Sequence, residues 1–425
     1  MSSIKQDCKL RVAVVGVGMG GVAAGLDLLE LPNVDIQLYE RSVEHRLAGA
    51  WLGVTPSALK RLVDWVEEER VDQVITRRYN AFTALHWQTG DILHRPEQVD
   101  GAKLTKAERL NQMGVSNAIR SELHQLTLKL LPQGLVHTGK KCLSLEETSD
   151  GVSIKFEDGT DAVADLVIAA DGINSGIRKA FDPDYTVKYL GNIVYTCFGD
   201  YNELKRDIPD LPEDDLVLYR GNCLVFMGYV GLNQYALELI VPEDMPESQT
   251  VRWNTIADEA RLNRLLEYFK DWTPMINQFV RFAMKHNIDM VMLPRIRGGW
   301  APSMIASNRI AYIGDAAHPT AGAFSSGTSF AWEDSSTLAS ALKYAYQKHK
   351  NQWDAGTVGD ALHIYDEIRS THYKKVFQQV MKFEEGWKND LEDMAVNVSA
   401  NDIHWITNHD AKEAFKSWEK DHPIE

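Results

Sequence analysis

Three short motifs in this sequence combine glycine and aspartate in ways that could shape the backbone around parts of one large dinucleotide. They are, in chain order, GVGMGG at residues 16–21, AADG at residues 169–172 and GDAAHP at residues 314–319. Glycine permits tight turns and close approach to a phosphate, and a carboxylate accepts hydrogen bonds from sugar hydroxyls. The chemistry they predict is ligand recognition, provided that the fold brings them together.

The first motif follows an apolar, β-branched run at residues 10–15 and precedes a helical pattern, which is the order of a dinucleotide-binding unit. A second apolar run, residues 34–39, ends in Glu40, whose carboxylate could accept hydrogen bonds from a ribose diol. The glycines expected to allow the tight turn, the approach of a pyrophosphate and close helix packing are, respectively, Gly16, Gly18 and Gly21.

The other two motifs also follow predicted strands. An apolar strand ending at residue 168 would place Asp171 and Gly172 at the carboxyl edge of a sheet, where ligands bind in α/β folds. Asp315 follows the strand at residues 309–313 and could accept a hydrogen bond from a ribityl hydroxyl. The three motifs together therefore predict a flavin site.

A long helix, predicted from Phe330 to about residue 350, follows the third motif. Gly327 and Thr328 at its N-terminus would offer N–H groups and a positive dipole to the flavin N1 and C2 carbonyl, which become negative on reduction. This is the electrostatic environment that a reduced flavin needs.

Arg120 is placed in the first turn of an amphipathic helix predicted over residues 117–131, with Ser116 or Asn117 as its cap. A positive charge at a helix N-terminus is slightly unfavourable because of the helix dipole. A solvated surface arginine and an arginine that binds an anion such as the flavin pyrophosphate both remain open.

Residues 189–293 form short alternating runs with one helical stretch at 255–279, which predicts a mostly antiparallel sheet inserted in the first domain. Core packing is the default role of aromatic residues on such strands. A few could line a pocket for a flat substrate. Our candidates, with no catalytic base assigned, are Trp51 in a loop of small residues, Tyr195 and Phe226.

Length, composition and net charge restrict the classes of partner that we expect for this chain. A chain of 425 residues exceeds one usual core, and its net charge of −15 argues against nucleic acid or an anionic membrane as the main partner. No apolar run is long enough to span a bilayer, and the first strand begins too early to follow a signal peptide, so we expect a cytoplasmic protein. The four cysteines form no CxxC pair and the 13 histidines no HExxH motif, so no metal site is expected.

These motifs, with Glu40, Arg120 and the stretch DLVIAADGINSGIR at residues 165–178, resemble the signatures of the single-component FAD-dependent aromatic hydroxylases, the salicylate and 6-hydroxynicotinate hydroxylase type. The resemblance extends to about residue 369. It implies an α/β protein with a Rossmann-like FAD-binding domain (residues 1–80, 105–185 and 295–365), an inserted, mostly antiparallel substrate domain (81–104 and 186–294) and a C-terminal helical segment (366–425). The residues that it implies for FAD are Gly16, Gly18, Gly21, Glu40, Ala50, Arg120, Asp171, Gly172, Asp315, Gly327 and Thr328.

The resemblance also implies an activity. NADH or NADPH would visit transiently and reduce FAD, and O2 would then give a C4a-hydroperoxyflavin that hydroxylates a small phenolic or heteroaromatic molecule, with or without a carboxylate. A monomer or a homodimer is expected. An epoxidase or oxidative-rearrangement enzyme of secondary metabolism, an FAD-dependent oxidase or dehydrogenase, and a non-catalytic FAD-fold binding protein remain alternatives.

The sequence departs from the family pattern at two places. Gly322 stands where the family usually has a proline, so the loop after the third motif is expected to differ in geometry beside the flavin. Many relatives carry an arginine on the strand that opens the substrate domain, where this chain has Tyr195-Thr196-Cys197. That difference argues against a clamp for an anionic substrate on this strand.

Overall fold

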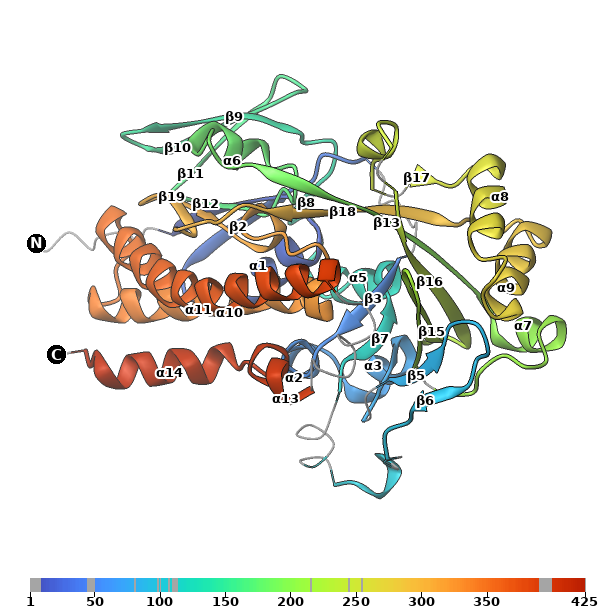
Figure 1. The fold of residues 1–425 in the computed structure, drawn as a ribbon. Helices are drawn as coiled ribbons and strands as arrows, with labels where there is room; N and C mark the ends of the chain where they lie inside the picture. The colour runs from blue at the N-terminus through green and yellow to red at the C-terminus, as the bar shows by residue number, and fades with distance from the viewer. Residues whose placement is uncertain are drawn as a thin grey trace, which may run out of the picture.

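A six-stranded sheet lies at the centre of the first domain (Figure 1). The computed structural model describes residues 9–43, 50–79, 82–97, 99, 101–105, 108, 114–214, 216–243, 245–253, 255–389 and 400–424. The strands are, in spatial order, β19 (Ile305–Ser307), β20 (Ile310–Tyr312), β12 (Leu166–Ala169), β1 (Leu10–Val15), β2 (Val34–Tyr39) and β8 (Val136–His137). All neighbours pair in parallel except β19 and β20.

This sheet is covered on both faces, as a parallel sheet must be to bury its apolar side chains. Helices α1 (Met19–Leu28), α10 (Gly327–Lys348) and α11 (Ala355–Asn389) lie on one side (Figure 1). On the other side lies an antiparallel sheet of β9 (Cys142–Thr148), β10 (Gly151–Phe156) and β11 (Asp161–Ala164), which leads into β12 and α6 (Gly176–Phe181). One hydrophobic core joins these layers, which confirms the expected Rossmann-like fold class.

The second sheet has eight strands and is antiparallel except for one parallel pair, β14 and β5. Its order is β17 (Thr255–Ile256), β18 (Val291–Gly298), β13 (Val187–Asp200), β16 (Gln234–Pro242), β15 (Leu224–Tyr229), β14 (Leu216–Arg220), β5 (Thr83–His86) and β6 (Ile92–His94). Helices α7 (Tyr201–Asp207), α8 (Glu259–Tyr268) and α9 (Pro274–Lys285) lie beyond its outer face (Figure 1).

The single helical stretch expected at residues 255–279 is therefore wrong in detail. Thr255–Ile256 pairs with β18 as a strand, and Pro274 begins a new helix after α8 has ended. Proline is favoured in the first turn of a helix and disfavoured inside one, which explains the break.

A small sheet of β3 (Trp51–Val54), β7 (Ser116–Ile119) and β4 (Ile75–Thr76) lies between the two large sheets, with α2 (Pro56–Trp65), α3 (Glu68–Val74) and α5 (Arg120–Leu128) nearby. The helix expected from residue 117 begins only at Arg120, because Ser116–Ile119 pairs with β3. Ser116 and Asn117 are therefore strand residues and not caps, while Arg120 does occupy the first turn.

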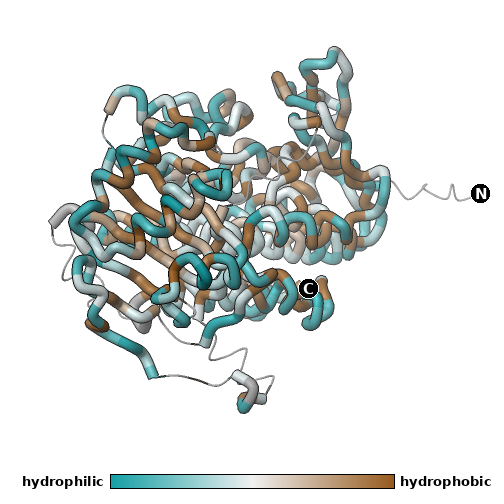
Figure 2. The backbone as a smooth tube through the Cα atoms, turned by 90° about the vertical axis from the view of Figure 1, so that its right-hand side faces the viewer, coloured by the Kyte–Doolittle hydropathy of each residue, from teal (hydrophilic) through white to brown (hydrophobic). Residues whose placement is uncertain are grey.

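The C-terminal helices α13 (Ala400–Thr407) and α14 (Ala411–Asp421) follow α11, and α14 packs against α10. Short 3-10 helices are η1 (Gly101–Lys103), η2 (Ser248–Thr250), η3 (Gly314–Ala316) and η4 (Ala323–Ser325). The domain boundaries expected at residues 295 and 366 lie inside β18 and α11, respectively. Hydrophobic segments concentrate in the interior strands and helices (Figure 2), and none of the described helices is long and apolar enough to cross a membrane.

Candidate functional site

The three motifs begin side by side at one edge of the six-stranded sheet. Val15 at the end of β1 pairs with Ala169 at the end of β12, and Ala169 pairs with Tyr312 at the end of β20. Because these strands are parallel, the motifs that follow them all leave the same carboxyl edge. Strand β1 is also the point from which the chain first builds outward through β2 and later returns through β12, and ligands bind at such a switch point.

The glycine turn after β1 contains two glycines that the packing requires and one that faces open space. A Cβ on Gly16, whose φ is +101°, would lie 2.3 Å from the carbonyl oxygen of Ala170, and one on Gly21 would lie 1.9 Å from that of Gly16. A Cβ on Gly18 would meet nothing within 4 Å. Gly18 precedes α1, so the open side of the turn lies at a helix N-terminus suited to a phosphate.

The Glu40 carboxylate is fixed against this turn. Its Oε2 accepts a hydrogen bond from the Val17 backbone N–H at 3.0 Å, and its Oε1 accepts one from the Ser42 N–H at 2.9 Å. Each carboxylate oxygen can accept a further hydrogen bond. Glu40 is therefore positioned by the backbone and still able to bind hydroxyl groups.

Asp315 of the third motif and Arg120 at the start of α5 form a half-buried pair of opposite charges. Burial raises the pKa of Asp315, and the charges of His318 and Arg120 act against that rise. Within the part of the chain that the structure describes, neither side chain makes a hydrogen bond. Such groups are costly to bury without partners, so they fit a ligand that supplies both an anion and hydroxyls.

Asp171 has a structural role of its own. Its Oδ2 accepts hydrogen bonds from the N–H groups of Gly176 at 2.9 Å and Ile177 at 3.3 Å, which holds the start of α6. Its Oδ1 is buried and has no partner among the described residues. The following Gly172 has a φ of +82° and open space around its missing Cβ.

The loop before α10 is held in an unusual backbone conformation. Ala321, Phe324 and Ser325 have φ values of 54°, 57° and 53°, which cost non-glycine residues about 1–3 kcal/mol each. Gly322 has a φ of +77°, a value closed to the proline that the family usually carries, since proline fixes φ near about −65°. The loop ends at Gly327, where a Cβ would meet nothing within 4 Å, and Thr328 is buried.

A buried network that the motifs did not reveal holds the third motif in place. Asp334 on α10 accepts hydrogen bonds from the Gly314 N–H at 2.8 Å and from Arg369 Nε at 2.8 Å, and pairs with His318 Nε2 at 2.7 Å. Burial acts to raise the pKa of Asp334, but the charges of His318 and Arg369 outweigh burial and hold that pKa below its usual value. The signal in the sequence is the pair of adjacent acidic residues, Glu333 and Asp334, inside the predicted helix.

The eight-stranded sheet presents one face to these motifs, which we call the inner face. Ala50 packs there against Val291, Leu293 and Val194, and Trp51 packs near Val230 and Ala236. Arg295 Nε donates a hydrogen bond to the carbonyl of Ala321 at 3.2 Å, which joins the sheet to the strained loop. Phe226 lies on the same face, in a cluster with Leu218, Leu224 and Ile240.

Tyr195, another candidate for the substrate pocket, does not share the inner face with Phe226. Its side chain lies on the opposite, helix-covered face, where its hydroxyl donates to Glu243 and accepts from Arg261 Nη1 of α8 at 3.2 Å. Side chains alternate along a strand, so the neighbours Val194 and Thr196 take the inner face instead. The sequence could not show which alternate set of β13 side chains faces inward, because both sets contain apolar and aromatic residues.

Glu238 is an inner-face residue that the sequence analysis missed. It pairs across the sheet with Thr196 on one side and Phe226 on the other, and directly paired residues share a face. Burial raises the pKa of Glu238 to about 7, and the charge of Arg295 opposes this rise. A single glutamate in the apolar strand QYALELIVP was the available signal.

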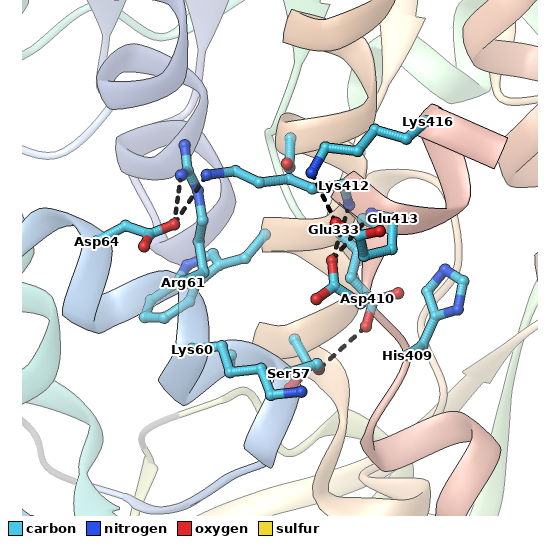
Figure 3. A pocket seen from close by; sticks show the side chains of 15 residues that line it. Ser57, Lys60, Arg61, Asp64, Glu333, His409, Asp410, Lys412, Glu413 and Lys416 are labelled. Carbon is cyan, nitrogen blue, oxygen red and sulfur yellow. Dashed lines mark hydrogen bonds and ion pairs between the residues drawn. The ribbon is translucent and has the colours of Figure 1, made fainter. Parts of the chain in front are cut away.

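A second polar region lies between α2, α10 and α14, around a cavity of about 260 Å³ (Figure 3). Arg61 and Lys412 both bind Asp64 there, which ties α14 to α2. Nearby, Glu333, His372 and His409 bring potential metal ligands within 4.8 Å of one another, a grouping that motif spacing could not reveal.

The geometry of this trio favours packing over metal binding. The two imidazole rings stack with centroids 3.8 Å apart at an interplanar angle of 20°, so their nitrogen lone pairs do not converge on one point. Glu333 Oε2 already accepts a hydrogen bond from Arg369 Nη1 at 3.0 Å. The stacked rings instead hold the segment before α14 against α11.

No protein-family model matches the chain. It is 27% identical to a 6-hydroxynicotinate 3-monooxygenase of Pseudomonas fluorescens, covering 78% of this chain and 82% of that protein. It is 25% identical to a salicylate hydroxylase of Pseudomonas putida, covering 94% and 93%. The structure of Klebsiella pneumoniae HpxO complexed with FAD and uric acid has the same fold, with a TM-score of 0.73 at 20% identity over 99% of this chain and 94% of that one.

Proposed function

We propose that this chain, whose resemblance to the single-component FAD-dependent aromatic hydroxylases is confirmed by its relatives, is an FAD-dependent monooxygenase acting on a small aromatic molecule. The proposal further assigns NADH or NADPH as the electron donor and O2 as the oxidant. The observation that carries it is the convergence of the three motifs at one sheet edge, beside a pair of opposite charges that has no side-chain hydrogen bond to any described residue.

The residues at this edge fit FAD. Gly18 and the N-terminus of α1 would take the pyrophosphate, together with Arg120, and Glu40 would take a ribose diol. Asp315 would accept from ribityl hydroxyls, and Gly327 and Thr328 would offer the N-terminus of α10 to the flavin ring. Asp171 and Gly172 complete the edge, and Ala50 lies in the adjoining loop. When bound, FAD would accept electrons from the nicotinamide and react with O2.

The rest of the site would hold the substrate. Trp51 and Phe226 remain partly exposed on or beside the inner face and are suited to packing against an aromatic ring. The strained loop at residues 320–326 contacts both β3 and β18, so it links the small sheet to the inner face. These elements would orient the ring and exclude water from it.

The test is a screen of aromatic compounds for NAD(P)H oxidation that depends on both the compound and O2, with product masses measured. We expect a product that has gained one oxygen atom, and we expect no turnover in Asp315→Ala protein that has lost FAD. Turnover that yields hydrogen peroxide and an oxidised product without added oxygen would instead identify an oxidase. Epoxidation would appear as the same mass gain with a loss of unsaturation. A chain that binds FAD and is never reduced by NADH or NADPH would contradict the proposal.

A further inference from the structure

The inner face carries a carboxylate, that of Glu238, among side chains that are mainly aromatic and aliphatic. Phe226 and Glu238 on this face stay partly exposed, whereas Leu237 and Leu239, which point to the helix-covered face, are fully buried. The inner face is therefore reachable from outside the core. A ligand resting on it would meet the Glu238 carboxylate directly.

Neither Glu238 nor its cross-strand partner Thr196 has its hydrogen-bonding capacity filled. Thr196 is 0% exposed, and its Oγ1 has no partner among the described residues. The Glu238 carboxylate likewise accepts no hydrogen bond from any residue that the structure describes. Among the described residues, the buried Thr196 hydroxyl therefore lacks a partner, which is costly, and the partly exposed Glu238 carboxylate beside it is free to accept a hydrogen bond from a donor on a ligand.

The Glu238 carboxylate already has a positively charged neighbour in the protein, Arg295. Arg295 interacts electrostatically with both Glu238 and Glu384 of α11, and Arg297 Nε donates to Glu384 at 2.6 Å. Two arginines therefore face two glutamates. A substrate carboxylate would add an uncompensated negative charge beside Glu238, and this cost disfavours anionic rings.

We propose that Glu238 and Thr196 are specificity-determining residues that select a ring bearing an N–H or O–H donor and no carboxylate. The assignment rests on the proposed function and narrows its substrate class to neutral or cationic rings. It sets this chain apart from relatives named for 6-hydroxynicotinate and salicylate, which are carboxylated rings. It also agrees with the absence of an arginine from the Tyr195-Thr196-Cys197 strand segment.

The test measures binding to the FAD-loaded protein for three matched pairs of probes: aniline and anthranilate, phenol and salicylate, and indole and indole-2-carboxylate. Calorimetry and perturbation of the flavin absorbance would give each dissociation constant. We expect at least one uncarboxylated probe to bind about tenfold or more tightly than its carboxylated partner. Glu238→Gln should reduce that ratio of dissociation constants to near one. Thr196→Val should weaken the binding of the same uncarboxylated probe.

Glu147→Gln, an exposed glutamate of β9, is the matched control and should leave the ratio unchanged. Equal or tighter binding of the carboxylated partner in every pair would overturn the assignment. The assignment would also fail if no uncarboxylated probe bound, or if Glu238→Gln left the ratio of dissociation constants unchanged. A failure of the proposed function would be seen in a different experiment, as a product without added oxygen. The two failures are distinguishable because the binding ratio is measured without turnover.

Discussion

Gly18 and Gly21 lie three residues apart in one turn, yet the structure gives them different constraints. A Cβ at Gly21 would collide with the carbonyl of Gly16, whereas one at Gly18 would enter open space. Gly21→Ala should therefore lower the free energy of unfolding of the FAD-free protein by about 1–3 kcal/mol. Gly18→Ala should leave that stability unchanged and weaken FAD binding, because the added methyl group would occupy the side offered to the pyrophosphate. Denaturant unfolding and FAD titration of both variants separate these effects. Equal stability losses in the two would contradict this account.

Glu238 gives a pH prediction at the same scale. Burial raises its pKa to about 7, against the opposing charge of Arg295, so the carboxyl gains a proton as the pH falls through that value. Because the ionised form is the stronger acceptor, affinity for the preferred uncarboxylated probe should decrease from pH 8 to pH 6 by about tenfold. The same titration of Glu238→Gln should be flat. A pH dependence that persists in this variant would assign the titration to another group.

At the scale of elements, the third motif is held by helices α10 and α11 through Arg369, which binds both Glu333 and Asp334. Arg369→Met should remove the cation that these two buried carboxylates share and lower the free energy of unfolding by about 3–5 kcal/mol. The exposed pair of Arg206 and Glu203 offers a control, since Arg206→Met should cost less than about 1 kcal/mol. Similar small losses in both variants would show that the network does not hold the fold.

The elements also show which features the sequence could predict. Gly16 and Gly21 were predictable because a turn between a strand and a helix is a local structure with a strong glycine requirement. The start of α5 was not, because Ser116–Ile119 becomes a strand only by pairing with distant β3. The faces taken by Tyr195 and Glu238 could not be predicted for a related reason. The inward face of a strand depends on what the whole sheet packs against, and a shift of one residue reverses it.

At the scale of the whole molecule, the site exists only when segments more than 300 residues apart meet. FAD would contact the glycine turn through its adenosine and pyrophosphate part and α10 through its flavin ring. Saturating FAD should therefore stabilise the folded chain, by about 2.7 kcal/mol at a hundred times its dissociation constant. FMN, which lacks the adenosine half, should raise the melting temperature less. Equal shifts with FAD and FMN would argue that the glycine turn and Glu40 take no part.

The most direct measurement is the FAD content and FAD affinity of the purified protein, compared with Asp315→Ala and with the surface control Glu147→Gln. If the three motifs form one site, the protein and the control will be yellow, with about one FAD per chain, and Asp315→Ala will bind FAD at least about tenfold more weakly. Protein that is colourless, and stays so after incubation with excess FAD, would contradict the account at its centre.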